Sequence, residues 1–300
     1  MADAPAAGRP GRALPPVRPE FERDEALEEL PAAVQRPLRL RERLSGSEPF
    51  RLTVLLVALA LGWQVYGLWL NNPLLVPTLG ETLEAFWASV LSGVLPLRTW
   101  TSLRVLLLGY AAGVGLATVM TVLAITTRTG RDLLQLLTSM LAPLPAIALL
   151  PLALLWFGLG EPSTMFVLIH SVLWPLALNT YSGFRSVSET LRMAGQTIGV
   201  SGLRFVLKIL IPAAFPSILT GLKISWAFSW RSLIAAELVF GVSAGSGGLG
   251  WFIFENRNQL EIAQVFAGLI TVILIGLLVE GLVFRTVERR TVRRWGMQRA

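Results

Sequence analysis

The chain has 300 residues and a net charge of +7, and 53% of its residues are hydrophobic against 15% that are charged. This is too apolar for an ordinary soluble domain of that length, so we expect the chain to lie in a lipid bilayer. There is no cysteine and only one histidine, His170. Disulfide frameworks, thiolate nucleophiles and clustered metal centres are therefore excluded.

Residues 1–49 are rich in proline and in charges of both signs. Such a composition cannot bury enough apolar surface to order itself, so the sequence predicts a disordered N-terminal tail. The segment is too long and too acidic for the charged start of a signal peptide. The apolar stretch that follows should therefore be retained as a membrane span.

Six stretches are long and apolar enough to cross a bilayer, since a helical span needs about 20 residues. They are residues 52–70, 105–125, 133–158, 164–182, 209–240 and 262–284. The pattern predicts an all-α, polytopic membrane protein. Its six-helix transmembrane domain would cover residues 50–285, with a basic C-terminal tail at residues 286–300.

Lysine and arginine are concentrated on one side of these stretches. They gather in the N-terminal tail, in the loops after the second and fourth stretches, and after Phe284, whereas the opposite side holds only Arg98 and Arg257. Because cytoplasmic segments carry the excess of positive charge, the pattern predicts that both termini are cytoplasmic.

Two segments on the predicted outer side show local structure. Residues 78–81, Thr-Leu-Gly-Glu, have the form of a capping box and precede apolar residues at helical spacing, which predicts an amphipathic helix on the outer membrane surface. Residues 241–250 are too rich in glycine for a helix interior and indicate a mobile or re-entrant loop. That loop would be a gate, a docking surface for an external partner, or a plain turn.

The predicted cytoplasmic loop at residues 183–208 is longer than two neighbouring spans require. Ser186 and Glu189 have capping-box spacing, Gly199 suits the end of a first short helix, and Ser201 can cap a second. One apolar stripe would run along this segment: Val187, Leu191, Ala194 and Ile198. The sequence therefore predicts a helical elbow that can pass a rigid-body push from a soluble partner into the spans.

The chain has two lysines, Lys208 and Lys223, and each follows a leucine. No Gly-Lys pair of a phosphate-binding P-loop is therefore present. If ATP drives this protein, another subunit must bind it.

Residues 193–212 resemble a known motif. Met193-Ala194-Gly195, then Gly199, then Ile209-Leu210-Ile211-Pro212 is similar to the EAA loop of permease subunits of binding-protein-dependent ABC importers. The family pattern is Glu-Ala-Ala, three residues, Gly, nine residues, Ile-x-Leu-Pro, and this chain departs from it at Met193, Gly195 and Ile211. Residues 143–158, 178–181 and 236–238 resemble the sulfonate, taurine and nitrate type of these permeases.

This resemblance implies a type I ABC importer permease fold and a transport function without covalent chemistry in this chain. It implies a second permease copy in a homodimer, two copies of an ABC ATPase subunit that bind ATP and Mg, and a periplasmic or lipid-anchored substrate-binding protein. The location implied is the bacterial inner membrane, with lipid contacts, no nucleic acid and no cofactor in this chain. The elbow would be the coupling helix that docks in a groove of the ATPase. Its expected coupling residues are Glu189, Arg192, Met193, Ala194, Gly195, Gly199, Ile209 and Pro212.

Six residues are candidates for the translocation pathway: Pro143, Pro145, Ser225, Ser229, Arg231 and Glu237. The prolines delete backbone donors, and broken helices of this kind line pathways, with a simple kink as the alternative. Charge at the centre of a membrane helix costs about 2.5 kcal/mol or more, so Arg231 and Glu237 each need a partner, water or substrate. Arg231 would suit a small oxyanion, whereas Glu237 is either a pathway residue, a structural ion pair or a headgroup contact.

Other intramembrane residues have both functional and packing interpretations. Trp226 and Trp230 would wall a narrow pore or, more often, pack. Gly109 and Gly113 have the spacing of close helix contacts. His170 is expected to be a hydrogen-bonded packing residue, with a proton relay as the alternative.

Three classes of function remain open, led by an importer permease for a small, anionic solute such as a sulfonate, taurine or nitrate. A self-sufficient secondary transporter or channel would be expected to carry more carboxylates in its spans than Glu237 and Glu280. A membrane enzyme would need a nucleophile, metal or acid-base set, and none is visible. A structured cytoplasmic docking loop is required only by the first class.

Overall fold

The computed structural model describes residues 48–240 and 247–294. Throughout these ranges the regular structure is helical and contains no strand. Five of the described helices are long and apolar enough to cross a membrane, or six if one bent pair counts as a single span. The predicted all-α, multi-pass architecture is confirmed. The expected tail at residues 1–47 and most of the glycine-rich loop, residues 241–246, lie outside the described residues.

The chain divides into two compact units after Ala58. The boundary falls within the first helix, α2 (Glu48–Leu70), and everything from Leu59 onward belongs to the second unit. Within that unit, the indole nitrogen of Trp63 donates a hydrogen bond to the carbonyl of Pro77 over 3.0 Å. The end of α2 is thereby tied to the loop that leads into α3.

Helix α3 (Leu79–Leu91) begins with the predicted capping box. The backbone N–H of Glu81 donates to Thr78 Oγ1 over 3.2 Å, and the N–H of Thr78 donates to the Glu81 carboxylate over 2.8 Å. Two N–H groups that the first turn of a helix leaves open are thus satisfied reciprocally.

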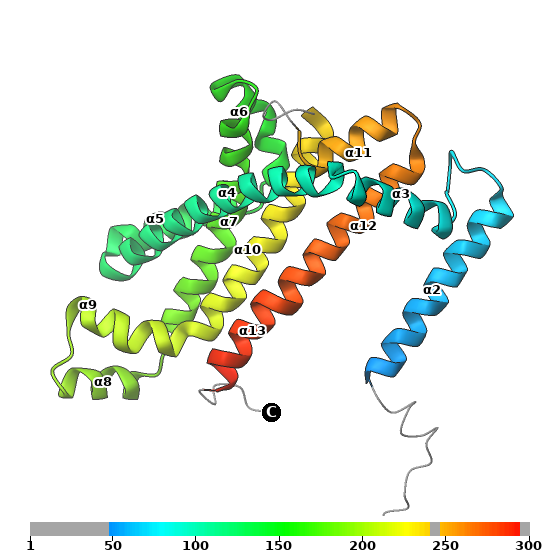
Figure 1. The fold of residues 1–300 in the computed structure, drawn as a ribbon. Helices are drawn as coiled ribbons and strands as arrows, with labels where there is room; N and C mark the ends of the chain where they lie inside the picture. Colours follow the sequence, from blue (N-terminus) through cyan, green and yellow to red (C-terminus); the bar gives the residue numbers. More distant parts are fainter. Residues whose placement is uncertain (1–47, 241–246, 295–300) are drawn as a thin grey trace, which may run out of the picture. The chain divides into compact units, whose positions relative to one another are not determined.

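Three long helices form the centre of the second unit: α4 (Val94–Thr126), α7 (Glu161–Arg185) and α10 (Ile211–Phe240). Helix α7 packs along both of the others (Figure 1). A Cβ atom added at Gly113 would lie 2.6 Å from the Cβ of Val172, and one at Gly109 would lie 2.8 Å from Leu168. The predicted close contact at these glycines is therefore confirmed and joins α4 to α7 within the chain.

The third predicted span is a pair of helices. Helix α5 (Arg128–Leu141) and the arm formed by η2 (Ala146–Leu149) with α6 (Leu150–Phe157) meet at 89°. The break that the prolines predicted is therefore confirmed, and the span predicted over residues 133–158 is made of two helices that begin at Arg128 and end at Phe157. Pro143 and Pro145 lie at the bend, where each lacks the N–H that would continue the helical hydrogen bonds.

After α7 the chain forms the elbow: α8 (Glu189–Thr197), α9 (Gly202–Phe205) and a π-helical turn, η3 (Val206–Leu210), that runs directly into α10. Helix α11 (Leu249–Asn258) follows the glycine-rich segment. In Figure 1, α8 and α9 lie at one end of the second unit and α6 and α11 at the other.

The last helix is longer than predicted. Helix α12 (Ile262–Leu278) continues through η4 (Val279–Phe284), α13 (Arg285–Glu288) and η5 (Arg289–Arg293). Residues 286–293, which fall in the predicted basic C-terminal tail, are helical, and Phe284 and Val292 are buried against Leu219 of α10. The Nζ of Lys223 reinforces this contact, since it lies 2.8 Å from the carboxylate of Glu288 and 3.7 Å from that of Glu280.

Candidate functional site: the elbow and an intramembrane cavity

The first helix of the elbow begins later than its predicted cap. Ser188, and not Ser186, is the N-cap of α8, and its hydroxyl accepts the N–H of Leu191 over 3.4 Å. Ser186 instead ends α7, where its hydroxyl donates to the carbonyl of Gly183 over 2.9 Å. The capping-box prediction is wrong because Val187 is buried and the chain must leave α7 before the new helix starts. Glu189 is the first residue of α8, where an acid suits the helix dipole.

Gly199 ends α8 as predicted. Its φ of 75° lies in the left-handed region, which an L side chain disfavours. The N–H of Gly199 donates to the carbonyl of Gln196 over 2.9 Å, and the N–H of Val200 donates to that of Gly195 over 3.0 Å. These two bonds define a Schellman motif, which satisfies carbonyls that the helix end would otherwise leave open.

Gly195 lets α8 pack closely against α9 and η3, which lead into α10. The residue is buried, and an added Cβ would lie 2.9 Å from the ring of Phe205 and closer still to the Cδ1 of Ile209. The two large side chains therefore fill the space that a methyl group would need. This contact explains why glycine stands at position 195, where the EAA-loop pattern has alanine.

Arg192 joins α8 to the end of α7. Its Nη2 donates to the carbonyl of Phe184 over 2.6 Å, and its Nε donates to that of Val187 over 3.3 Å. A guanidinium at the open carbonyls of a helix C-terminus is favourable. Arg192, predicted as a coupling residue, therefore braces the elbow from inside.

The outer surface of α8 is apolar. The exposed fractions are 42% for Leu191, 58% for Met193 and 75% for Ile198, and Ala194 is exposed as well. In the predicted stripe only Val187 is buried. The stripe therefore points away from the chain, and the buried face of α8 is made by Arg192 and Gly195 instead. Ile209 and Pro212, the remaining predicted coupling residues, are half-buried where η3 meets α10.

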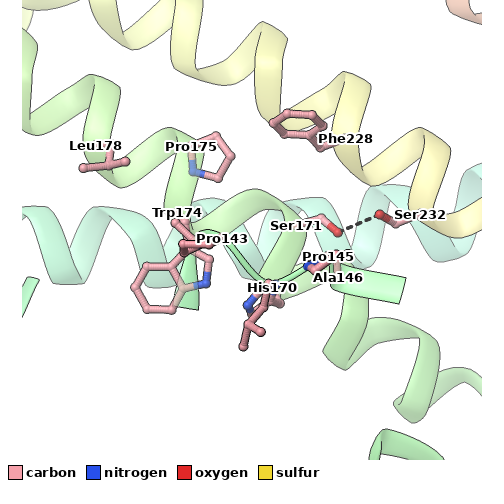
Figure 2. A pocket seen from close by; sticks show the side chains of 12 residues that line it. Pro143, Pro145, Ala146, His170, Ser171, Trp174, Pro175, Leu178, Phe228 and Ser232 are labelled. Atoms are coloured by element: carbon pink, nitrogen blue, oxygen red, sulfur yellow. Dashed lines mark hydrogen bonds between the residues drawn. The ribbon is translucent and has the colours of Figure 1, made fainter. Parts of the chain in front are cut away.

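A cavity of about 430 Å³ lies at the bend between α5 and η2 (Figure 2). The predicted pathway residues Pro143 and Pro145 line it from the bend. Helix α7 contributes His170, Ser171, Trp174, Pro175 and Leu178, and helix α10 contributes Phe228 and Ser232. The cavity thus has walls from three of the predicted spans.

Two of the predicted pathway residues, Ser225 and Ser229, have a different role. Both are fully buried and neither lines the cavity. The hydroxyl of Ser225 donates to the carbonyl of Val172 over 3.1 Å, and that of Ser229 donates to Trp226 of its own helix over 3.0 Å. Both hydroxyls take part in helix packing in this structure, and α10 reaches the cavity through Phe228 and Ser232 instead.

Arg231 lies on the exposed side of α10. Its guanidinium carbon is 5.1 Å from the ring centroid of Phe228, which lines the cavity, and its Nε donates to the carbonyl of Ala227 over 3.0 Å. The structure shows no ion pair for Arg231 within the described ranges. The cation therefore stacks over a residue that lines the cavity, and no carboxylate pairs with it in the described part of the chain.

Glu237 is part of a hydrogen-bonded clamp. Only 3% of it is exposed, and its carboxylate accepts the Ser102 hydroxyl over 2.8 Å and the N–H of Gly250 over 2.7 Å. The Ser102 hydroxyl in turn accepts the N–H of Leu249 over 2.8 Å. Glu237 is thus neither a cavity residue nor one half of an ion pair. It caps the N-terminus of α11 from another helix.

Arg98 extends this clamp on the side of α4. Its guanidinium donates to the carbonyl of Gly247 and to the carboxylate of Glu255, each over 3.3 Å. Helices α4, α10 and α11 are therefore joined at one place. The sequence signal for the clamp was the intramembrane acid, but nothing in the spacing indicated Ser102 or Arg98 as its neighbours.

The two tryptophans and the histidine are packed among other helices. Trp230 is buried and its indole N–H donates to the carbonyl of Val272 over 3.3 Å. Trp226 contacts Tyr110 edge to face, with ring centroids 5.4 Å apart. His170 lies close to the backbone of Leu141 and packs edge to face against Trp174, with ring centroids 6.0 Å apart.

Known proteins resemble the chain over most of its length. Residues 109–293 match the family model of the binding-protein-dependent transport system inner membrane component. The taurine transport system permease protein of Escherichia coli is 30% identical over 85% of this chain and 93% of its own length. An aliphatic sulfonates transport permease protein of Bacillus subtilis is 29% identical, with coverage of 84% and 89%. A nitrate import permease protein of Synechocystis is 31% identical, with coverage of 62% and 66%.

Proposed function

Because the chain belongs to the inner membrane components of binding-protein-dependent transport systems, we propose that it is the permease of an ATP-driven importer for a small anionic solute. The relatives named for taurine, sulfonates and nitrate support that solute class. The absence of a P-loop Gly-Lys pair from the sequence supports a separate ATPase subunit.

The elbow is the observation that carries this proposal. Three exposed apolar side chains of α8 form a surface that a soluble partner can cover, since Leu191, Met193 and Ile198 would otherwise stay in water. The partner we propose is the ATPase, bound in two copies to two copies of this chain. Glu189 and Ala194 would border the same contact.

The contacts behind the stripe explain how a push on α8 reaches the membrane. Gly195 presses α8 against Phe205 and Ile209, which lead without interruption into α10. Arg192 fastens the same helix to the end of α7. A displacement of α8 is therefore passed to α7 and α10 together, and these helices form two walls of the cavity.

The distribution of lysine and arginine supports one orientation of this protein in the membrane. We propose that the elbow and both termini face the cytoplasm, and that α6 and α11 at the other end face the substrate-binding protein outside the inner membrane. The clamp around Glu237 would then hold the outer end of α10 against α4 and α11. Binding energy from ATP in the partner would shift the chain between an outward-open and an inward-open state.

Arg231 supports an anionic solute. A guanidinium inside a spanning helix costs about 2.5 to 3.5 kcal/mol on insertion scales unless water or an anion meets it. Its exposure and its stacking over Phe228, which lines the cavity, fit a water-filled pathway along α10. A guanidinium there would attract sulfonate or nitrate by charge and by its fork of N–H donors.

The decisive experiment is purification of the tagged chain from its native membrane in mild detergent, followed by mass spectrometry and reconstitution into proteoliposomes. We expect a P-loop ATPase to co-purify and uptake to require ATP. The Ile198→Asp variant should lose the ATPase, because a charge would enter the apolar contact, whereas Asn72→Asp, exposed at the end of α2, should keep it. A complex without any ATPase, with uptake abolished by uncouplers, would instead establish the self-sufficient transporter.

A further inference from the structure

A second pocket lies where the elbow meets the ends of several helices. Its volume is about 380 Å³, whereas one water molecule occupies about 30 Å³ in the liquid. The wall is built from the last turn of α4, the first turn of α5, the end of α7, helix α8 and the end of η3. A ligand in this pocket would therefore touch the elbow and three helices of the membrane domain at the same time.

Three arginines line this pocket, each from a different helix. Arg131 belongs to α5, Arg185 to the end of α7 and Arg192 to α8. One carboxylate, that of Glu189, lies in the same lining, so three positive charges against one negative charge leave a formal charge of +2. Positive charges that share a pocket repel one another and attract an anion from outside.

The three guanidiniums are not neutralised within the described part of the chain. The ion pairs of basic side chains there are made by Arg98, Arg104 and Lys223 instead. Arg131 and Arg185 are exposed. Their guanidiniums are therefore accessible and can turn toward a ligand that enters the pocket.

Arg192 is already held in position before a ligand arrives. Its Nη2 donates to the carbonyl of Phe184 over 2.6 Å, and its Nε donates to that of Val187 over 3.3 Å. A guanidinium has about five N–H groups to donate, so these two bonds leave others for an acceptor in the pocket. A planar fork that is fixed in this way loses little freedom on binding and matches the oxygens of a phosphate group.

The charge of the lining selects the ligand. A phosphate group carries up to about two negative charges and several acceptor oxygens, which match the formal charge of +2 and the three guanidiniums. A singly charged solute such as a sulfonate or nitrate would leave part of this charge uncompensated. The candidate spans end at Thr126 and Arg185 beside the pocket, and basic pockets at the ends of spans are accessible to lipid headgroups as well as to soluble ions.

We propose that this pocket binds a phosphate group, held by Arg131, Arg185 and Arg192. A phospholipid headgroup and a soluble phosphate both present this chemistry. The bound group would join α8 to α5, and α5 leads into the bend that lines the intramembrane cavity. If the chain acts as the importer permease proposed above, a displacement of α8 would then also reach this third wall of the cavity. Binding itself does not depend on that function.

The sequence contains no cysteine, so one introduced thiol can report on the pocket. The Ile125→Cys variant places the thiol on the pocket wall at a half-buried position, and Thr129→Cys places it on an exposed part of α5 outside the pocket. The assembled transporter in nanodiscs, without ATP, is treated with methyl methanethiosulfonate, and labelling of this chain is followed by intact mass. One arm compares phosphatidylcholine nanodiscs with and without cardiolipin. The other arm adds inorganic phosphate to phosphatidylcholine nanodiscs.

We expect a phosphate source to slow labelling of Ile125→Cys and to leave labelling of Thr129→Cys unchanged. Protection by cardiolipin alone identifies a lipid headgroup as the ligand, and protection by inorganic phosphate identifies a soluble one. Methanesulfonate should protect only at about tenfold the concentration of phosphate or more, because it makes fewer charge-assisted contacts.

Substitutions in the lining test which residues hold the phosphate. Arg131→Gln or Arg185→Gln, added to Ile125→Cys, should each raise the amount of probe needed for half-protection about tenfold, since one hydrogen bond to a charged group contributes about that factor. Both side chains are exposed, so the fold should tolerate either change. Arg128→Gln and Arg204→Gln are the matched controls. They remove the same charge from exposed positions outside the pocket and should leave protection unchanged.

Several results would overturn the site. An Ile125→Cys thiol that is unreactive without either probe would mean a pocket closed by the chain or by its partner, and a reactive thiol that neither probe protects would mean a pocket that holds water. Equal weakening by Arg131→Gln and Arg204→Gln would mean attraction by general surface charge, and equal potency of methanesulfonate would mean no selection of phosphate. Labelling requires neither ATP nor transport. ATP-dependent uptake is measured separately, so failure of the importer function is distinguished from failure of this site.

Discussion

Removal of the Ser102 hydroxyl should release the N-terminus of α11. In the Ser102→Ala variant the N–H of Leu249 loses its acceptor, and the buried carboxylate of Glu237 loses one of its donors. A buried polar group without its partner costs about 1 to 3 kcal/mol, so two such groups predict a local loss of about 2 to 6 kcal/mol. Ser102 is fully buried, and water cannot readily replace it.

Hydrogen exchange measured by mass spectrometry on peptides that cover α11 reports this loss. Because about 1.4 kcal/mol is a factor of ten, exchange of the first amides of α11 should accelerate about 30- to 20,000-fold. Ser139→Ala is the matched control, since that exposed hydroxyl donates only to the Leu136 carbonyl of its own helix. Unchanged α11 exchange in Ser102→Ala, or equal acceleration in Ser139→Ala, would show that the clamp does not hold this helix.

Three further substitutions test the elbow, the packing and the pathway. Gly199→Val should strain the left-handed residue that ends α8 by about 1 to 2 kcal/mol and uncouple ATP hydrolysis from uptake in proteoliposomes; coupled uptake at the wild-type rate would contradict this. Gly113→Val should push α4 from Val172 and lower the melting temperature of the assembly, with an overpacking cost of about 1 to 3 kcal/mol, whereas Gly115→Val, which meets no atom within 4 Å, should not. Arg231→Gln should reduce oxyanion uptake while the complex elutes intact from a sizing column, and wild-type uptake would remove Arg231 from the pathway.

Features that depend on a few consecutive residues were predictable. The capping box at Thr78 and the helix end at Gly199 each arise from hydrogen bonds that span at most five positions. The spans follow from apolar length, because a chain in a bilayer must satisfy its backbone within each helix. The spacing of Gly109 and Gly113 predicted a close contact with another helix, but it did not say that this helix would be α7.

Features that depend on distant residues were not predictable in the same way. The prolines at the bend indicated a broken helix, but the 89° angle and the cavity exist only because α7 and α10 pack there. Ser188 replaced Ser186 as the cap because burial of Val187 sets where α7 can end. The apolar stripe of α8 turned outward because Gly195 fits against Phe205 and Ile209, and periodicity alone does not say which face is covered.

Glu237 shows the difference most clearly. The sequence by itself determined that an acid inside a span needs a partner, because an unpaired charge is costly in a low-dielectric interior. Only the tertiary structure decided that the partner is Ser102, which lies 135 positions away in the chain, and that the amide of Gly250 completes the set. Composition and local hydrogen bonding therefore define the helices of this protein, whereas the packing of helices distant in sequence decides which polar groups meet, and so where the clamp and the cavity form.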